Sequence, residues 1–201
     1  MTMLPVSSVI LAGGQSNRMG VNKAFLEIGG RPIIERVIEQ MALVGQEVIL
    51  VTNAPQEYEH LGCPMVPDVF PGRGSLGGIY SGLRAASNQY ALVVACDMPF
   101  LNASLLRYMI LMSWGYDIVV PRTGQGVEPL HAIYSKACLI PMEELLRQNN
   151  LKIISFYSRV RVRYLEQEEV EILDHRHLSF FNINLPDDLE WARRLAVEID
   201  S

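Results

Sequence analysis

Along residues 1–120, short continuous apolar runs alternate with segments in which apolar residues recur every three or four positions. The continuous runs, at residues 8–11, 47–52 and 90–95, are typical of strands that are buried on both faces of a parallel sheet. Helical spacing is clear over residues 33–41, directly after a proline that suits a first helical turn. The chain therefore begins with a strand, a helix and a second strand.

The same two patterns predict the remaining elements. Further strands are expected at residues 65–66, 117–120, 131–134 and 160–165, and further helices at residues 75–86, 101–112, 136–149 and 186–199. The alternation over the first 120 residues predicts a three-layer α/β/α sandwich around a Rossmann-like, mostly parallel sheet with right-handed crossovers. No linker or repeat interrupts the pattern, so we expect one domain, residues 1–201.

Composition and charge exclude several classes of protein. The apolar runs are far shorter than the roughly 20 residues that span a bilayer, and the first residues carry no positively charged leader, so we expect a cytoplasmic protein with no membrane contact. Three widely separated cysteines lack zinc-site spacing and are interpreted as reduced thiols. A net charge of -5 argues against nucleic acid as a partner.

A glycine-rich segment, LAGGQSNRMGVNK, follows the first predicted strand. Gly13 and Gly14 let backbone amides approach an anion, while Arg18 and Lys23 neutralise phosphate charge. The segment matches neither the Walker A pattern nor the GxGxxG fingerprint. We interpret it as a polyphosphate-binding loop, and the alternative is a tight glycine turn with solvated basic residues.

Asp97 comes directly after the apolar run 90–95 and Cys96, so its carboxylate is expected at the carboxyl edge of the sheet. Mg²⁺ prefers one or two carboxylates together with phosphate oxygens and water. We therefore predict that Asp97 binds Mg²⁺ together with a triphosphate. The alternative, an aspartate that caps a helix ahead of Pro99, is less favoured.

Weaker candidates are Asn53 and Asp68, which follow the second and third strands, and Asn182 and Asn184, which alternate before the last helix. The first pair could bind ribose hydroxyls or a base edge, and the second pair could point into the cleft. Asn and Asp are, however, also common turn and cap residues. Without support from other features of the sequence, we interpret Asn53 and Asp68 as turn residues. His131 is predicted to be a hydrogen-bonded histidine of the core rather than a base.

At this point the pattern LAGG-x-S-x-R-M-G-x-x-K resembles the nucleotidyltransferases that join a nucleoside monophosphate to a phosphorylated acceptor. More narrowly, the chain is similar to the molybdenum cofactor guanylyltransferase family. The likeness continues through GSLGG, CDMP, EPLHA and NINLPDDL, and it spans nearly the whole chain.

The resemblance implies a fold of the nucleotide-diphospho-sugar transferase type and transfer of GMP from GTP to the terminal phosphate of molybdopterin, with release of pyrophosphate. It implies a GTP site made of Leu11, Ala12, Gly13, Gly14, Lys23, Asn53, Asp68 and Asp97. The implied catalytic residues are Arg18, Lys23 and Asp97, with Mg²⁺ on Asp97 as the cofactor. Asn182 and Asn184 match positions near the acceptor. Transient contacts with other cofactor-biosynthesis proteins or recipient molybdoenzymes are also expected.

Two departures from the family pattern affect the acceptor side. Asn22 stands where an aspartate is common, and residues 149–152 lack a GERR-like basic run, which leaves Lys152 as the expected phosphate contact. Other functions therefore stay open at this point: a cytidylyltransferase acting on molybdopterin, a sugar-phosphate guanylyltransferase, or a non-catalytic GTP-binding protein that delivers the cofactor.

Overall fold

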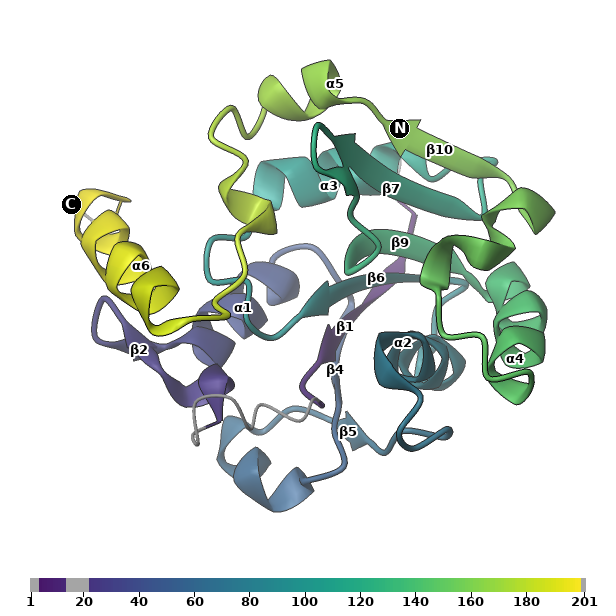
Figure 1. The fold of residues 1–201 in the computed structure, drawn as a ribbon, viewed down its shortest axis with the longest axis horizontal. Helices are drawn as coiled ribbons and strands as arrows, with labels where there is room; N and C mark the ends of the chain where they lie inside the picture. The colour runs from purple at the N-terminus through teal and green to yellow at the C-terminus, as the bar shows by residue number, and fades with distance from the viewer. Residues whose placement is uncertain (1–3, 14–21, 200–201) are drawn as a thin grey trace.

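The structure is a computed structural model that describes residues 4–13 and 22–199 (Figure 1). Within these residues the strands of the main sheet are β1 (Val6–Leu11), β4 (Glu47–Val51), β5 (Met65–Val66), β6 (Tyr90–Ala95), β7 (Ile118–Thr123), β8 (Gly126–Val127), β9 (His131–Ser135) and β10 (Val162–Leu165). The helices are α1 (Ile33–Ala42), α2 (Gly74–Ala85), α3 (Ala103–Met112), α4 (Leu139–Arg147), α5 (Gln167–Glu171) and α6 (Pro186–Ile199). A small hairpin joins β2 (Glu27–Ile28) to β3 (Arg31–Pro32).

The sheet has the strand order β10-β7-β9-β6-β1-β4-β5, with β8 beside β7. β1 lies at its centre and pairs in parallel with both β4 and β6, so that Ile10 stands opposite Leu50 and Val94. The chain first runs outward from β1 to β4 and β5, and then returns to β6 on the other side of β1. Such a reversal leaves a crevice at the carboxyl ends of the central strands.

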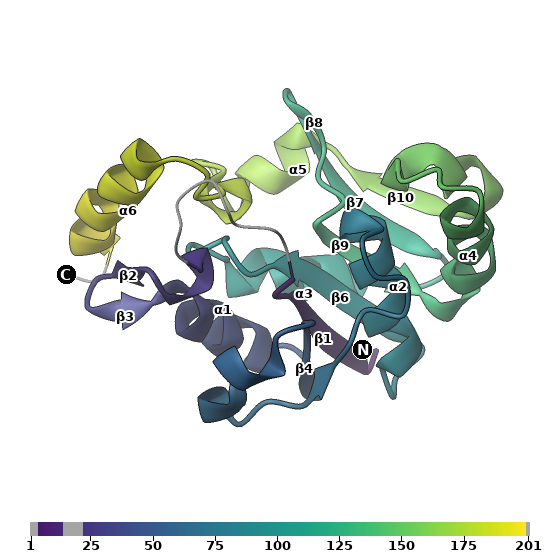
Figure 2. The ribbon, with the colours of Figure 1, turned by 60° about the horizontal axis from the view of Figure 1, so that its bottom comes forward.

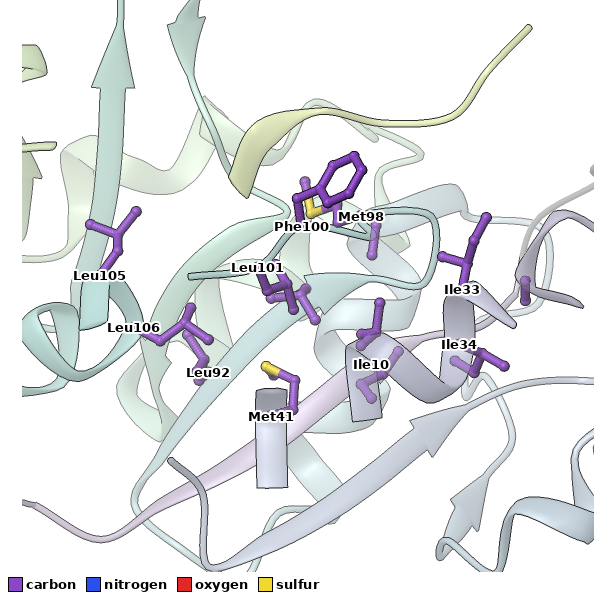
Figure 3. Close-up of a cluster of buried hydrophobic side chains, with 14 of the residues drawn as sticks. Ile10, Ile33, Ile34, Met41, Leu92, Met98, Phe100, Leu101, Leu105 and Leu106 are labelled. Carbon is purple, nitrogen blue, oxygen red and sulfur yellow. The ribbon is translucent and has the colours of Figure 1, made fainter. Parts of the chain in front are cut away.

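Two apolar cores cover the two faces of the sheet. The first lies against α1, α3 and α6 and includes the fully buried Ile10, Met41 and Leu92 (Figure 3). The second lies against α2 and α4 and takes the alternate residues of the same strands, such as Val9 and Leu11 of β1. Figures 1 and 2 show the sheet between these two layers of helices. The predicted three-layer sandwich with a mostly parallel sheet is therefore confirmed.

The element boundaries agree with the sequence pattern in most places. The helix predicted at residues 186–199 is α6, and that predicted at residues 101–112 begins at Ala103 because the side chain of Asn102 accepts hydrogen bonds from the first turn. The helix predicted at residues 136–149 is a 3-10 turn followed by α4. None of the helices in the described part of the chain is long and apolar enough to cross a membrane.

Candidate active site

A cavity of about 1040 Å³ opens at the carboxyl edge of the central strands. The residue two positions beyond the end of each of four strands lines it: Gly13 after β1, Asn53 after β4, Asp68 after β5 and Asp97 after β6. The first turn of α2 and the segment 182–184 also line it. The cavity therefore occupies the crevice that the strand order creates, and it brings together the predicted residues Leu11, Ala12, Gly13, Asn53, Asp68, Asp97, Asn182 and Asn184.

Asn53 and Asp68 hold each other in place at one side of the cavity. The side-chain oxygen of Asn53 accepts a hydrogen bond from the Asp68 amide at 2.9 Å, and Asp68 Oδ1 accepts one from Ser81 Oγ at 2.9 Å. A Cβ atom at Gly77 would lie 3.0 Å from Asp68 Oδ2, so a glycine permits this close approach. Both residues fix the loop, as the turn interpretation expects, and both also face the cavity.

Asn182, Ile183 and Asn184 alternate, as expected of an extended segment. The side chain of Ile183 is fully buried in the core, while both asparagines line the cavity. The Ile183 amide donates to the main-chain oxygen of Asp97 at 3.1 Å. This contact fixes the 182–184 segment beside the end of β6.

Lys23 begins the 3-10 turn Lys23–Phe25 and is almost completely buried. Its ammonium group donates to the main-chain oxygen of Ile183 at 3.0 Å and lies 3.4 Å from Asn184 Oδ1. Lys23 is not one of the described residues that line the cavity. The same peptide segment therefore holds both Lys23 and Asp97, and contact of Lys23 with a phosphate stays a prediction.

Asp97 is the acidic residue at the end of β6. Burial raises the pKa of Asp97, and a main-chain hydrogen bond and the charge of Lys23 oppose this effect. Within residues 4–13 and 22–199, no group of three or more His, Cys, Asp or Glu side chains could hold a metal ion. A single half-buried carboxylate suits a cation that completes its coordination with phosphate oxygens and water.

Besides Lys23, three predicted residues are not among those that line the cavity. Gly14 and Arg18 lie outside the described residues. Lys152 precedes a 3-10 segment and does not line the cavity, although a hydrogen bond between Asn149 and Arg73 brings its loop to the start of α2. A role for Lys152 at the acceptor stays a prediction.

The sequence did not single out Glu57 and Tyr58, which also line the cavity. The Tyr58 hydroxyl donates to the main-chain oxygen of Ala12 at 3.2 Å and accepts from the side-chain amide of Asn22 at 2.9 Å. Both residues belong to irregular 3-10 turns, where apolar periodicity carries no signal.

Cys96 and His131 also lie near the end of β6. Burial raises the pKa of Cys96 to about 12, so its thiol stays protonated near neutral pH. His131 is fully buried, as predicted, but neither ring nitrogen has a hydrogen-bond partner among the described residues. The predicted hydrogen bond is therefore wrong, because the ring packs edge-on against Phe180 at 5.0 Å between centroids.

Comparison with known proteins identifies relatives of this chain. The family model of the MobA-like NTP transferase domain matches residues 8–162. A probable molybdenum cofactor guanylyltransferase of Pelotomaculum thermopropionicum is 46% identical over 96% of this chain and 95% of its own length. The molybdenum cofactor guanylyltransferase of Desulfosudis oleivorans is 39% identical over 93% of this chain and 94% of its own length.

A solved structure extends the likeness to the fold. The crystal structure of molybdopterin-guanine dinucleotide biosynthesis protein A from Archaeoglobus fulgidus has a TM-score of 0.83 and 29% identity, and the match covers 96% of this chain and all of that one. Fold and comparisons define the protein as a nucleotidyltransferase. The chain belongs to the MobA-like NTP transferase family. Enzymes of this family generally use a divalent metal ion.

Proposed function

We propose that the protein is a molybdenum cofactor guanylyltransferase, which transfers GMP from GTP to the terminal phosphate of molybdopterin and releases pyrophosphate. The proposal is supported by the names of the relatives at 46% and 39% identity, which match this chain over more than nine-tenths of its length. The structural observation that carries it is the cavity at the carboxyl edge, where Gly13 and Asp97 face a segment containing two asparagines.

The two substrates carry negative charge and must approach each other. An oxygen of the acceptor phosphate forms a bond to the α-phosphorus of GTP while the bond to the bridging oxygen of the β-phosphate breaks, and the electron pair leaves with pyrophosphate. Lys23, held by Ile183, contributes positive charge close to Asp97. Phosphate is already ionised near neutral pH, so the step needs no general base.

The donor set at the end of β6 fits a hard divalent cation. Asp97 offers a carboxylate whose pKa is raised by burial, so a nearby positive charge would relieve the cost of burying its ionised form. We therefore assign Mg²⁺ to Asp97. When bound, Mg²⁺ would supply positive charge to the phosphates.

The remaining assignments follow from the layout of the cavity. Asn53 and Asp68 would contact the nucleotide, and Asn182 and Asn184, which lie beside the end of β6, would contact the acceptor. We also propose that the protein is a cytoplasmic enzyme. Contacts with other cofactor-biosynthesis proteins or with recipient molybdoenzymes, and the absence of nucleic acid as a partner, remain predictions.

The test compares the wild type and Asp97→Asn for pyrophosphate release from GTP and from CTP, with and without molybdopterin, at saturating Mg²⁺. We expect release with GTP that depends on molybdopterin, and a loss of about 100-fold or more in kcat/KM for Asp97→Asn. The exposed Asp187, which does not line the cavity, provides the matched control Asp187→Asn with unchanged kinetics.

Each other outcome contradicts a defined part of the proposal. Release with CTP instead of GTP would identify a cytidylyltransferase, and release with a sugar phosphate instead of molybdopterin would identify a different acceptor. Binding of GTP without turnover would identify a carrier. Wild-type turnover by Asp97→Asn would contradict the role of Asp97.

A further inference from the structure

One buried tyrosine joins two parts of the chain that border the cavity. Tyr58 is 2% exposed, and its ring packs on Phe25 with 5.1 Å between the ring centroids. Its hydroxyl donates to the main-chain oxygen of Ala12, the residue after β1, at 3.2 Å. The same hydroxyl accepts from the side-chain nitrogen of Asn22, which precedes Lys23, at 2.9 Å. A single hydroxyl thus links the end of the first strand to the turn that carries Lys23.

Both the oxygen and the nitrogen of the Asn22 side-chain amide make hydrogen bonds. Its oxygen accepts a hydrogen bond from the Ala24 amide at 3.1 Å and so caps the turn Lys23–Phe25. Its nitrogen also donates to Glu57 Oε2 at 2.5 Å. An ionised carboxylate can only accept, so Glu57 fixes the orientation in which the Asn22 nitrogen faces Glu57 and Tyr58.

We propose that Tyr58 and Asn22 act as positioning residues, which hold Ala12 and the turn Lys23–Phe25 in the positions that binding of the nucleoside triphosphate requires. The amide at position 22 is matched to the carboxylate of Glu57, to which it donates. This inference rests on the proposed function, because the reaction is the means by which its effect is measured. The pair Tyr58 and Asn22, with its contacts to Ala12 and Glu57, is called the clamp below.

The chemistry of a hydroxyl explains why an amide is needed. Tyr58 has one hydrogen to donate, and it gives this hydrogen to Ala12 because Asn22 acts as the donor on the other side. An aspartate at position 22 could only accept, so it would compete with Ala12 for the single hydrogen. It would also place a second negative charge against Glu57. An aspartate at position 22 would therefore disturb the contacts that Ala12, Tyr58 and Glu57 make in this chain.

Two further observations agree with a persistent clamp. Burial raises the pKa of Tyr58 to about 12, so the hydroxyl keeps its hydrogen throughout the neutral range. Each end of the clamp is also tied to the site. The Ala12 amide donates to the main-chain oxygen of Val51 at 2.9 Å, and the ammonium of Lys23 is held by Ile183. Displacement of either end would therefore move groups beside the cavity without touching the reacting atoms.

The first experiment measures KM for the nucleoside triphosphate, KM for the acceptor, kcat and Tm for Tyr58→Phe. This substitution keeps the ring that packs on Phe25 and removes only the hydroxyl. We expect KM for the nucleotide to rise about three- to tenfold, the range of a lost hydrogen bond, with KM for the acceptor unchanged. Tyr108→Phe is the matched control, because Tyr108 donates its hydroxyl to Glu169 at 3.0 Å and does not line the cavity.

The second experiment is a double-mutant cycle over positions 22 and 57. We expect Asn22→Asp to raise KM for the nucleotide about tenfold or more in the wild-type background, and by about threefold in the Glu57→Gln background, where the charge repulsion is gone and only the competition for the Tyr58 hydrogen remains. A circular dichroism melt of each variant separates this effect from loss of the fold.

The results distinguish the clamp from the proposed function. The measurements use whichever nucleoside triphosphate the wild type turns over, so use of CTP would contradict the guanylyltransferase assignment and leave the clamp open to the same test. The clamp is overturned if Tyr58→Phe has the nucleotide KM of the wild type. It is equally overturned if Asn22→Asp raises KM by the same factor in both backgrounds.

Discussion

We predict that burial of His131 makes the stability of the protein depend on pH. Its ring is fully buried at the start of β9, opposite Val94 of β6, and neither nitrogen is hydrogen-bonded among the described residues. Burial lowers the pKa of His131 from its ordinary value of 6.5 to about 4, and the charge of Asp174 opposes this effect only in part. The folded protein therefore holds His131 neutral at a pH where the unfolded chain binds a proton.

The direction and size of the effect follow from this difference. Well above pH 6.5 neither state binds the proton, so proton binding contributes nothing to the free energy of unfolding. As the pH falls from 6.5 towards 4, the unfolded state gains protons that the folded state does not, and stability is lost. The two pKa values correspond to a total of about 3 kcal/mol, of which about 2 kcal/mol is lost between pH 8 and pH 5.

Urea unfolding of the wild type and His131→Leu at pH 8, 6.5 and 5 measures this contribution. Leucine has a similar volume and replaces a ring without a hydrogen-bond partner in residues 4–13 and 22–199, so we expect near-equal stability at pH 8 and a shallower loss for the variant at pH 5. The exposed His175 provides the control His175→Leu, which keeps the wild-type dependence. Equal losses of free energy in wild type and His131→Leu between pH 8 and 5 would refute the reasoning.

Two other substitutions test the site and the packing behind it. Lys23→Met removes the ammonium that Ile183 holds, and we expect kcat/KM for pyrophosphate release to fall about 100-fold; a loss below about threefold would contradict a role for this charge. Gly82→Ala places a Cβ atom 2.3 Å from Val9 Cγ1, inside the core between α2 and β1. We expect a loss of about 1–3 kcal/mol in urea unfolding, and wild-type stability would show that α2 can shift.

The fold could be predicted because each central strand is a continuous apolar run. Residues 91–95 are buried, and the pattern marks the limits of β6, Tyr90–Ala95, correctly. The edge of the site followed from the same pattern, since parallel strands end on one side of a sheet and Asn53, Asp68 and Asp97 each follow such a strand. The short hairpin β2 and β3 was missed because two-residue strands have no detectable periodicity.

The contacts that organise the site could not be predicted, because they join distant parts of the chain. Lys23 and Ile183 are 160 positions apart, and no local pattern indicates that one holds the other. Tyr58 lies in a segment of 3-10 turns, where neither helical nor strand spacing applies. The missing hydrogen bond of His131 likewise depends on where Phe180 packs, which the sequence around His131 does not determine.

The peptide of Ile183 has a consequence for the order in which the site forms during synthesis. Its amide reaches Asp97 and its carbonyl reaches Lys23, although every strand of the main sheet has been completed by Leu165. A nascent chain that has emerged only as far as β10 could pair all of these strands and still lack the contact that joins its cationic and acidic residues. Pairing of the strands can therefore precede formation of this contact, which requires a segment that is synthesised after β10.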